Sequence, residues 1–326
     1  MAATKVLFIG GTGIISSAAS ALAVERGMEV TLLNRGRSRR APAEGVEVLT
    51  ADVSDAAAVD AALSGREFDV VADMIAFTPA QVQRDIDRFE GRIGQYVFIS
   101  SASAYQKPVS RLPITESTPL RNPYWQYSRD KIACEDLLEA AYRDRGFPVT
   151  VLRPSHTYDE WTIPAFGGWT AIDRIRRGEE IVVHGDGTSL WTLTHSRDFA
   201  LGFVGLLGNP LAYGDTFQIT SDFVYTWNEI YGILGRAAGA EPRMRYATSA
   251  EIEALAPDRA GQLSGDMAHS VMFDNTKIRR LVPDFSPVVP LHLAAREIIE
   301  WHDAHPELQQ VDPAVNALFD ELLARR

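Results

Sequence analysis

The sequence predicts an α/β protein with a Rossmann-type, doubly wound parallel sheet, followed by a smaller C-terminal α/β domain. Short apolar runs alternate with helical stretches through the first half of the chain, which is typical of parallel βαβ units. A glycine-rich turn, Gly10-Gly11-Thr12-Gly13, stands between the first apolar run and the first helical stretch. Polar residues directly follow several of the runs, where the carboxyl ends of parallel strands would gather them.

Six apolar runs in the first half are predicted strands because they are short and rich in β-branched and aromatic residues. Gly27 follows the first helical stretch as a C-terminal glycine does, and Ser54-Asp55 precedes another as a helix cap does. The predicted strands are residues 6–9, 29–33, 46–49, 68–72, 96–99 and 148–152, and the predicted helices are residues 14–26, 54–63, 79–89 and 124–145.

The second half of the chain has a different sequence pattern. It begins with residues 155–169, in which the apolar residues show no clear periodicity. We expect this stretch to be a loop in which Trp161 and Trp169 lie over a site. Beyond it, strands are predicted at residues 181–183, 191–194, 216–219 and 243–246, and helices at residues 172–177, 198–207, 227–236, 276–281, 291–302 and 315–323.

The glycine turn predicts a binding site for an anion. A strand, a tight turn and a helix start together place backbone N–H groups and the positive end of a helix dipole at one point, which suits a pyrophosphate. Glycine-rich turns are weak evidence alone, but one between the first strand and first helix of a βαβ unit is much stronger. We therefore expect residues 1–154, with residues 195–220 returning to them, to bind a dinucleotide, and residues 155–326 mainly to bind substrate.

The end of the second predicted strand bears on the choice of dinucleotide. An acidic residue there would bind both adenosine ribose hydroxyls, but the chain has Asn34 and Arg35, followed by Arg37, Arg39 and Arg40. Four arginines at this place in an acidic protein favour a 2′-phosphate, so NADP is the expected cofactor. If the arginines form only a solvated loop, NAD is the alternative.

Tyr127 and Lys131 are candidate chemical groups. They lie four residues apart on a predicted helix that Asn122-Pro123 would start, so they share one face. We expect the ammonium to lower the pKa of the phenol by about 1–3 units, which would suit proton transfer near neutral pH. Ser101, at the end of the preceding strand, could hold a substrate oxygen against the phenol.

Taken together, these motifs resemble those of the extended short-chain dehydrogenase/reductases, the NAD(P)-dependent epimerase/dehydratase family. The similarity covers nearly the whole chain, and the glycine turn is most similar to that of the atypical branch. The family's turn usually begins with Thr-Gly and ends with a third glycine, and this chain departs from it with Ile9 at the start and Ser16 at the end. The matching segments are Gly10-Gly11-Thr12-Gly13, Asp52-Val53, Ser100 to Tyr105, Tyr127 with Lys131, Leu152-Arg153-Pro154, Gly185-Asp186-Gly187, the helix at Asp198, and Asp274 to Lys277.

The resemblance implies roles for particular residues. Tyr127 would be the general acid/base, Lys131 would anchor the nicotinamide ribose, and Ser101 would orient the reacting oxygen. The expected substrate contacts are Ser103, His156, Trp161 and Trp191. The expected cofactor contacts are Gly10, Gly11, Thr12, Gly13, Ile14, Ile15, Asn34, Arg35, Asp52, Val53, Ile75, Tyr127, Lys131 and Pro154.

The expected function is hydride transfer at a secondary alcohol or ketone of a small sugar-like or polyol-like substrate. Nucleotide-sugar members usually carry Asn and Arg where this chain has His156 and Trp191, and dehydratases carry Asp-Glu where it has Ala102-Ser103. One alternative is a sugar or nucleotide-sugar epimerase that holds NAD tightly. Another, of a different class, is a non-catalytic NAD(P)-binding regulatory or RNA-associated protein.

Composition limits the partners. The 326 residues carry a formal net charge of −11, which disfavours nucleic acid and anionic membranes. The single cysteine, Cys134, and the absence of a signal-peptide pattern predict a reducing, cytoplasmic location. No metal is expected, since His302 and His305 lack a third nearby ligand. A homodimer is expected.

Overall fold

The computed structural model describes residues 3–325. At its centre is a seven-stranded sheet in the order β11-β6-β5-β4-β1-β2-β3, in which every neighbouring pair of strands is parallel. This confirms the predicted α/β class. The strands are β1 (Lys5–Ile9), β2 (Glu29–Asn34), β3 (Glu47–Thr50), β4 (Val70–Asp73), β5 (Gln95–Ile99), β6 (Val149–Pro154) and β11 (Asp215–Ile219).

The order of the strands reverses beside β1. The chain runs outward from β1 to β3, then returns to the other side of β1 and continues from β4 to β6 and β11. Ligands of such sheets bind beyond the carboxyl ends of the strands at this switch point. The glycine turn follows β1, so it lies at that point.

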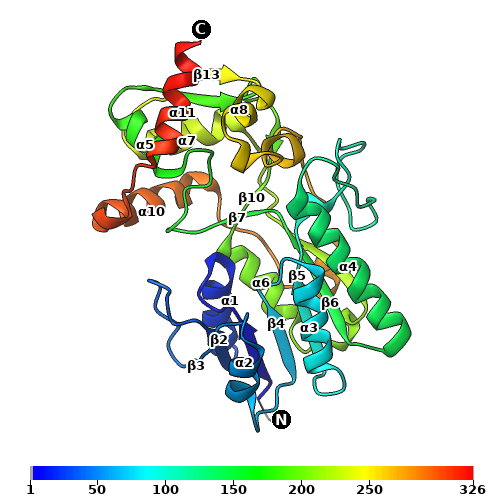
Figure 1. The fold of residues 1–326 in the computed structure, drawn as a ribbon. Coiled ribbons are helices and arrows are strands. Elements are labelled where there is room, and N and C mark those ends of the chain that lie inside the picture. The colour runs from blue at the N-terminus through cyan, green and yellow to red at the C-terminus, as the bar shows by residue number, and fades with distance from the viewer. Residues whose placement is uncertain (1–2, 326) are drawn as a thin grey trace.

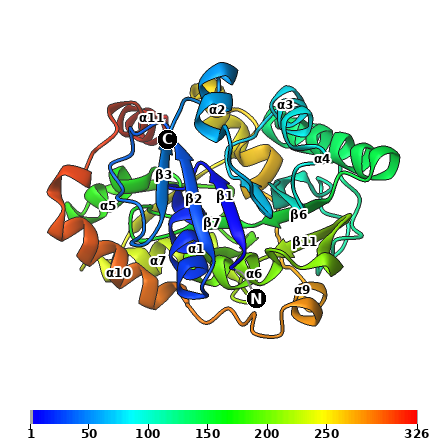
Figure 2. The same cartoon turned by 90° about the horizontal axis from the view of Figure 1, so that it is seen from below.

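Helices cover both faces of the sheet, as the view in Figure 2 shows. Successive residues of a strand point to opposite faces, and in β1 Phe8 packs in one buried cluster while Leu7 packs in the other. The first cluster includes α1 (Ile14–Glu25), α6 (Ser196–Leu206) and α9 (Thr276–Leu281), and the second includes α2 (Ala56–Leu63), α3 (Pro79–Phe89) and α4 (Gln126–Arg145).

The rest of the second half forms a separate layer above the carboxyl edge of the sheet (Figure 1). Its buried residues form a third hydrophobic cluster, and its strands pair in three small sheets, β10-β7, β12-β9 and β13-β8. These elements are β7 (His156–Tyr158), β8 (Glu180–His184), β9 (Leu190–Trp191), β10 (Leu193–His195), β12 (Tyr225–Thr226), β13 (Arg243–Ala247), α5 (Gly168–Arg176), α7 (Trp227–Ala237), α8 (Ser249–Leu255), α10 (Leu291–Ala304) and α11 (Pro313–Ala324).

Helix α4 starts later than the sequence indicated. It begins at Gln126 with Trp125 as the N-cap residue, rather than at residue 124. The Asn122 side chain instead accepts hydrogen bonds from the N–H groups of Tyr124 and Trp125, both at 3.2 Å. Asn122 therefore closes a turn in front of the helix.

Two other differences concern the second half. The expected loop at residues 155–169 contains the short strand β7, which pairs with β10. Helix α8 and a π-helical turn, η4 (Leu263–Met267), were not predicted. Within residues 3–325, no helix combines the length and apolar character that crossing a membrane requires.

Candidate active site

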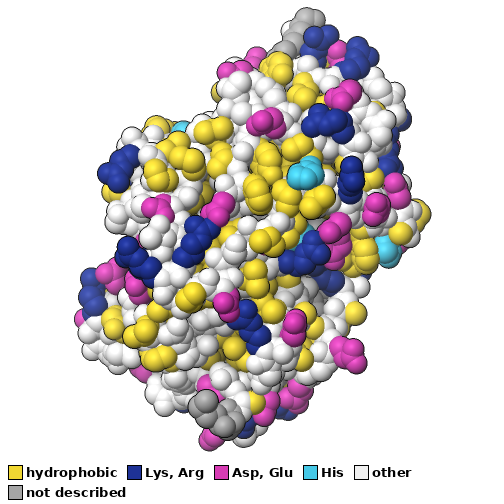
Figure 3. Space-filling model, turned by 180° about the vertical axis from the view of Figure 1, so that it is seen from behind, with side chains coloured by type: hydrophobic (Ala, Val, Ile, Leu, Met, Phe, Trp, Pro, Cys, Tyr) yellow, Lys and Arg dark blue, Asp and Glu magenta, His cyan; other side chains and the backbone are white. Residues whose placement is uncertain are grey.

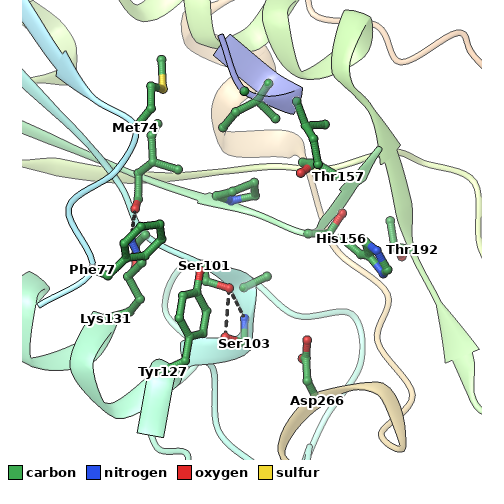
Figure 4. Close-up of a pocket in the computed structure, with 18 of the residues that line it drawn as sticks. Met74, Phe77, Ser101, Ser103, Tyr127, Lys131, His156, Thr157, Thr192 and Asp266 are labelled. Carbon is green, nitrogen blue, oxygen red and sulfur yellow. Dashed lines mark hydrogen bonds between the residues drawn. The ribbon is translucent and has the colours of Figure 1, made fainter. Parts of the chain in front are cut away.

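A cavity of about 490 Å³ lies between the carboxyl edge of the sheet and the C-terminal layer. Its walls bring together the glycine turn, the start of α1, the segment after β5, helix α4 and the residues that follow β6. Ser101, Tyr127 and Lys131 all line it, and Figure 4 shows them on one side of the opening. Ser103, His156 and Trp191 line it as well.

Lys131 is held firmly beneath this cavity. It is 1% exposed, and its Nζ donates hydrogen bonds to the carbonyl oxygens of Ala76 and Ile99, both at 2.7 Å. The Phe77 ring centroid lies 4.6 Å from the ammonium. Burial lowers the pKa of Lys131 to about 8. Two of its three N–H donors are thus used by the protein, which leaves one for a ligand.

The expected effect of Lys131 on Tyr127 is wrong for this structure. Burial raises the pKa of the Tyr127 phenol to about 12, although the hydrogen bond with Ser101 opposes the shift and the charge of Asp266 adds to it. The Lys131 ammonium lies 5.8 Å from the centroid of the tyrosine ring and is bonded to two carbonyls. The phenol is therefore protonated at neutral pH and ready to act as an acid.

A chain of hydroxyl groups ends at Ser101. Ser128 Oγ donates to Ser103 Oγ at 2.8 Å, and Ser103 Oγ lies 2.9 Å from Ser101 Oγ. The Ser103 N–H also donates to Ser101 Oγ, at 3.1 Å. Because Ser103 accepts from Ser128, it can donate to Ser101, whose own proton is then free to point at Tyr127 or at a substrate oxygen.

The glycine turn has the geometry of a phosphate cradle. Gly10 has φ +86°, and a Cβ there would stand 2.6 Å from Ile75 Cγ2, so only glycine fits. A Cβ on Gly11 would stand 2.4 Å from Leu32 Cδ2. Ser16, in the place of the usual third glycine, is fully buried and accepts a hydrogen bond from the Gly13 N–H at 2.7 Å. The serine is therefore compatible with the turn.

A second cavity, of about 460 Å³, continues the groove on the other side of the glycine turn. It shares Gly10, Gly13 and Ile75 with the first. Its other walls include the predicted contacts Thr12, Asn34, Arg35 and Val53, together with Arg37 and Arg40. The predicted contacts Gly11 and Asp52 line neither cavity. A groove that runs past a helix start in two linked halves fits an extended dinucleotide.

The polar residues around this second cavity are partly occupied by the protein itself. The Asn34 side chain accepts a hydrogen bond from the Gly11 N–H at 3.0 Å. Asp52 accepts from the Ser54 N–H and hydroxyl at 2.9 and 2.7 Å, and these bonds lower its pKa. Arg40 forms an ion pair with buried Asp159. Arg35 and Arg37 are the exposed cations that face this half of the groove.

Across the first cavity from Tyr127, His156 is a neutral donor. Its Nδ1 lies 3.2 Å from Trp191 Nε1, and because an indole N–H can only donate, Nδ1 must accept. Burial lowers the pKa of His156 to about 4, so at neutral pH the ring carries one proton, on Nε2. Ile14, Ile15 and Pro154 also line this cavity.

Trp161 lies outside the residues that form this cavity. Its ring packs on Trp301, with the centroids 5.4 Å apart, and Arg40 covers it at 5.0 Å. Trp169 likewise stacks on His302, with a centroid separation of 4.9 Å. The expectation that both tryptophans lie over the site is therefore wrong, since neither lines the first cavity, although Trp169 borders a separate cavity next to it.

Sequence reasoning missed several residues that line the first cavity. Asp266 comes from the unpredicted π-helical turn, and Figure 4 shows its side chain pointing toward the cavity. Phe77 follows β4 and packs at 6.2 Å from the Tyr127 ring. The position of Phe77, five residues after the predicted strand at residues 68–72, could have marked it, but no periodicity in the sequence marks Asp266.

This fold and this arrangement of Ser101, Tyr127 and Lys131 beside a dinucleotide groove define an enzyme of the short-chain dehydrogenase/reductase type. The model of one family, described as the NAD dependent epimerase/dehydratase family, matches residues 6–219. The protein belongs to that family, since the match covers more than half of the chain.

Relatives with curated names are distant. A chloroplast stem-loop binding protein of 41 kDa from Arabidopsis thaliana is 27% identical over 263 residues, which cover 76% of this chain and 67% of that protein. A UDP-glucose 4-epimerase from Lactobacillus helveticus is 30% identical over 168 residues, covering 46% of this chain and 50% of that protein. The chain thus spans about half the length of that epimerase.

Solved structures match over almost the full length. An epimerase from Methanothermobacter thermautotrophicus superposes with a TM-score of 0.78 at 16% identity and covers 94% of both chains. UDP-glucose 4-epimerase from Bifidobacterium longum, solved with NAD+ and UDP, has a TM-score of 0.75 at 18% identity, covering 93% of this chain and 99% of that chain. At such identities the similarity establishes the fold.

Proposed function

We propose that this protein is an NAD(P)-dependent oxidoreductase that transfers hydride at a secondary alcohol or ketone of a small sugar-like or polyol-like molecule. The proposed substrate class rests on the residues that line the first cavity. Among its described residues Lys131 is the only Lys or Arg, and that ammonium already binds two carbonyls. A diphosphate next to this reaction centre would be desolvated without cationic partners.

The chemistry of the residues supports this proposal. The bound nicotinamide would supply or accept the hydride. The Tyr127 phenol donates its proton to the ketone oxygen during reduction, and the phenolate takes the proton of the hydroxyl during oxidation. Ser101 holds the same oxygen by a hydrogen bond, and the remaining N–H of Lys131 is available for the nicotinamide ribose.

NADP is the proposed cofactor because Arg35 and Arg37 face the adenosine half of the groove. A guanidinium binds a 2′-phosphate through charge-assisted hydrogen bonds. Fluorescence titration with NADPH and NADH tests the preference. Arg35→Ala should weaken NADPH binding by about tenfold or more and leave NADH binding nearly unchanged, whereas the neighbouring Arg39→Ala is the control. Tighter or equal binding of NADH by the wild type would overturn this preference.

The substrate class is tested with a panel of compounds. Free sugars, polyols and simple ketones are assayed beside UDP-, GDP- and dTDP-sugars by the change in NAD(P)H absorbance, and products are analysed for epimers by chromatography. The proposal expects turnover among the free compounds. Efficient conversion of a nucleotide sugar, with the free compounds inert, would replace it.

An epimerase with tightly bound NAD is the second candidate, and one observation favours it. A further cavity of about 360 Å³ shares His156, Gln262 and Met267 with the first and is bordered by Arg259, which lies 3.4 Å from Asp312. A longer substrate could extend into it. A mass spectrum of the purified protein distinguishes the two: retained NAD(H) favours the epimerase, and an empty groove favours the oxidoreductase.

A non-catalytic RNA-associated role is a third candidate because a relative carries the name of a stem-loop binding protein. The net charge of −11 opposes it, and on the face in Figure 3 basic side chains are interspersed with acidic ones. Filter binding of a stem-loop RNA at about 50 mM and about 200 mM salt tests this role. Binding that survives the higher salt, together with no turnover of any compound, would favour it.

A further inference from the structure

We propose that Asp266, held in place by the buried Lys107, accepts a hydrogen bond from a second hydroxyl group of the substrate, close to the carbon on which Tyr127 acts. The inference deepens the proposed function and rests on it for the identity of the reacting group. It narrows the substrate class to neutral compounds that carry at least two hydroxyl groups, or a hydroxyl beside a ketone.

Asp266 lies where it could reach a substrate bound against Tyr127. Its side chain is 21% exposed, it lines the same cavity as Ser101 and Tyr127, and Figure 4 shows it directed toward that space. It is close enough to Tyr127 for its charge to raise the pKa of the phenol. A ligand bound against Tyr127 therefore lies within the electrostatic reach of this carboxylate.

The turn that carries Asp266 is fixed relative to the reacting groups. Asn122 is buried, and its Nδ2 donates both to the Ser103 carbonyl at 2.9 Å and to the Gly265 carbonyl at 2.7 Å. One side chain thus ties the segment of Ser101 and Ser103 to the residue preceding Asp266. The distance between the Asp266 carboxylate and the hydroxyl groups of Ser101 and Ser103 is therefore constrained.

Lys107 explains why a carboxylate is stable there. The lysine is fully buried, and its Nζ lies 3.3 Å from Asp266 Oδ1. Among residues 3–325, no side chain or backbone oxygen forms a hydrogen bond with that Nζ. A buried ammonium with a single ionic partner adds little stability, since its desolvation offsets the attraction. Burial raises the pKa of Asp266, and the charge of Lys107 opposes that rise. The pair is better explained by this effect, because Lys107 favours the charged form of Asp266 at the edge of the cavity.

The charge balance selects the ligand. Lys107 already offsets the charge of Asp266, so the carboxylate has no need of a second cation and is suited to a neutral hydroxyl donor. An ionised phosphate or carboxylate at the same place has no proton to donate to these acceptor oxygens. On the opposite wall His156 offers an N–H donor, as derived from its contact with Trp191. A polyol, whose hydroxyls both donate and accept, fits both walls.

Binding by the holoenzyme tests the inference independently of turnover. The probes are cyclohexanol, cyclohexane-1,2-diol, cyclohexane-1,3-diol and 2-aminocyclohexanol, and their affinities are measured by saturation-transfer NMR with the cofactor present. A hydrogen bond to a charged group is worth about tenfold to about 100-fold in affinity. The wild type should therefore bind at least one diol about tenfold more tightly than cyclohexanol, and more tightly than the amino alcohol.

The variants separate Asp266 from its surroundings. Asp266→Ala should reduce the preference for the diol to about threefold or less. Because this change leaves Lys107 without a partner, the double variant Lys107→Met with Asp266→Leu removes both charges and should lose the preference equally. Asp258→Ala, an exposed aspartate of the same half of the chain, is the control and should retain it.

The outcomes distinguish this inference from the proposed function. Equal binding of diols and cyclohexanol by the wild type, tighter binding of the amino alcohol, or a preference that survives in both variants would overturn the role of Asp266. A preference that depends on Asp266, for diols that are never oxidised, would support the role and contradict the oxidoreductase. Oxidation of the diols without tighter binding than cyclohexanol would support the oxidoreductase and contradict the role of Asp266.

Discussion

Ser128 offers a test of the chain of hydroxyl groups, because it follows Tyr127 directly in α4 but does not line the cavity. Its fully buried Oγ donates to Ser103 at 2.8 Å, and that bond determines which way the Ser103 and Ser101 protons point. Ser128→Ala removes one hydroxyl and leaves the helix intact. Loss of one buried hydrogen bond costs about 0.5–1.5 kcal/mol, so kcat should fall about 2-fold to about 13-fold if the whole cost appears in the transition state.

The pH profile separates a positioning role from simple destabilisation. The hydrogen bond from Ser101 opposes the upward shift of the Tyr127 pKa. If Ser101 loses its orientation, that pKa rises further, and alcohol oxidation, which needs the phenolate, requires a higher pH. A cost of about 1.36 kcal/mol corresponds to one pKa unit, so the midpoint of the oxidation profile should rise by up to about one unit.

The assay is steady-state oxidation of the best substrate from the panel, followed from mildly acidic to alkaline pH. Ser20→Ala is a matched control, because Ser20 is also a fully buried helical serine whose Oγ bonds to a backbone carbonyl, that of Ser17. A Ser128→Ala variant whose kcat and pH midpoint equal those of the Ser20→Ala variant would refute the hydroxyl chain.

Three further predictions concern other parts of the molecule. Burial beside Asp73 raises the pKa of Asp85 well above its usual value, so the contribution of this group to stability is full below about pH 3.9 and is lost as the pH rises through the folded-state pKa. The free energy of unfolding in urea should therefore be larger for Asp85→Asn than for the wild type at about pH 8, and the difference should be smaller at about pH 5. A larger difference at about pH 5 than at about pH 8 would contradict the direction of the pKa shift. Lys131→Met removes the ribose donor and should weaken cofactor binding by about tenfold and lower kcat as well, so an unchanged Kd in fluorescence titration would argue against this role. Arg40→Met leaves the buried Asp159 carboxylate without its ionic partner and should lower the free energy of unfolding in urea by about 3–5 kcal/mol. Adding Asp159→Asn in a double variant should restore most of that loss. Equal stabilities of the single and double variants would show that the pair is not coupled.

The sheet could be predicted from sequence because its strands are buried on both faces. Runs such as Val70-Val71-Ala72 are fully buried, so they appear in the sequence as continuous apolar segments bounded by polar residues. The glycine turn was equally recognisable, because the positive φ of Gly10 and its approach to Ile75 leave no room for another residue. Local sequence patterns therefore located the groove and the three candidate side chains that line it.

What sequence could not supply were contacts between distant segments. Arg40 belonged to a basic loop in the sequence, but its partner Asp159 lies in the other half of the chain. The spacing of Tyr127 and Lys131 correctly placed them on one helix, but not the carbonyls of Ala76 and Ile99 that engage the ammonium. The predicted direction of the tyrosine pKa shift was wrong because burial of the phenol, which the spacing does not reveal, raises its pKa. The pairing of Lys107 with Asp266 has no sequence signal at all.

The most direct test of hydride-transfer chemistry at this site is the turnover of Tyr127→Phe, measured beside its affinity for the cofactor. The ring remains, so the Kd for NADPH or NADH should stay within about threefold of the wild-type value. Loss of the proton donor should lower kcat on the best substrate of the panel by about 100-fold to about 10,000-fold. A variant that binds cofactor normally and keeps most of its kcat would contradict the assignment of Tyr127 as the acid and base.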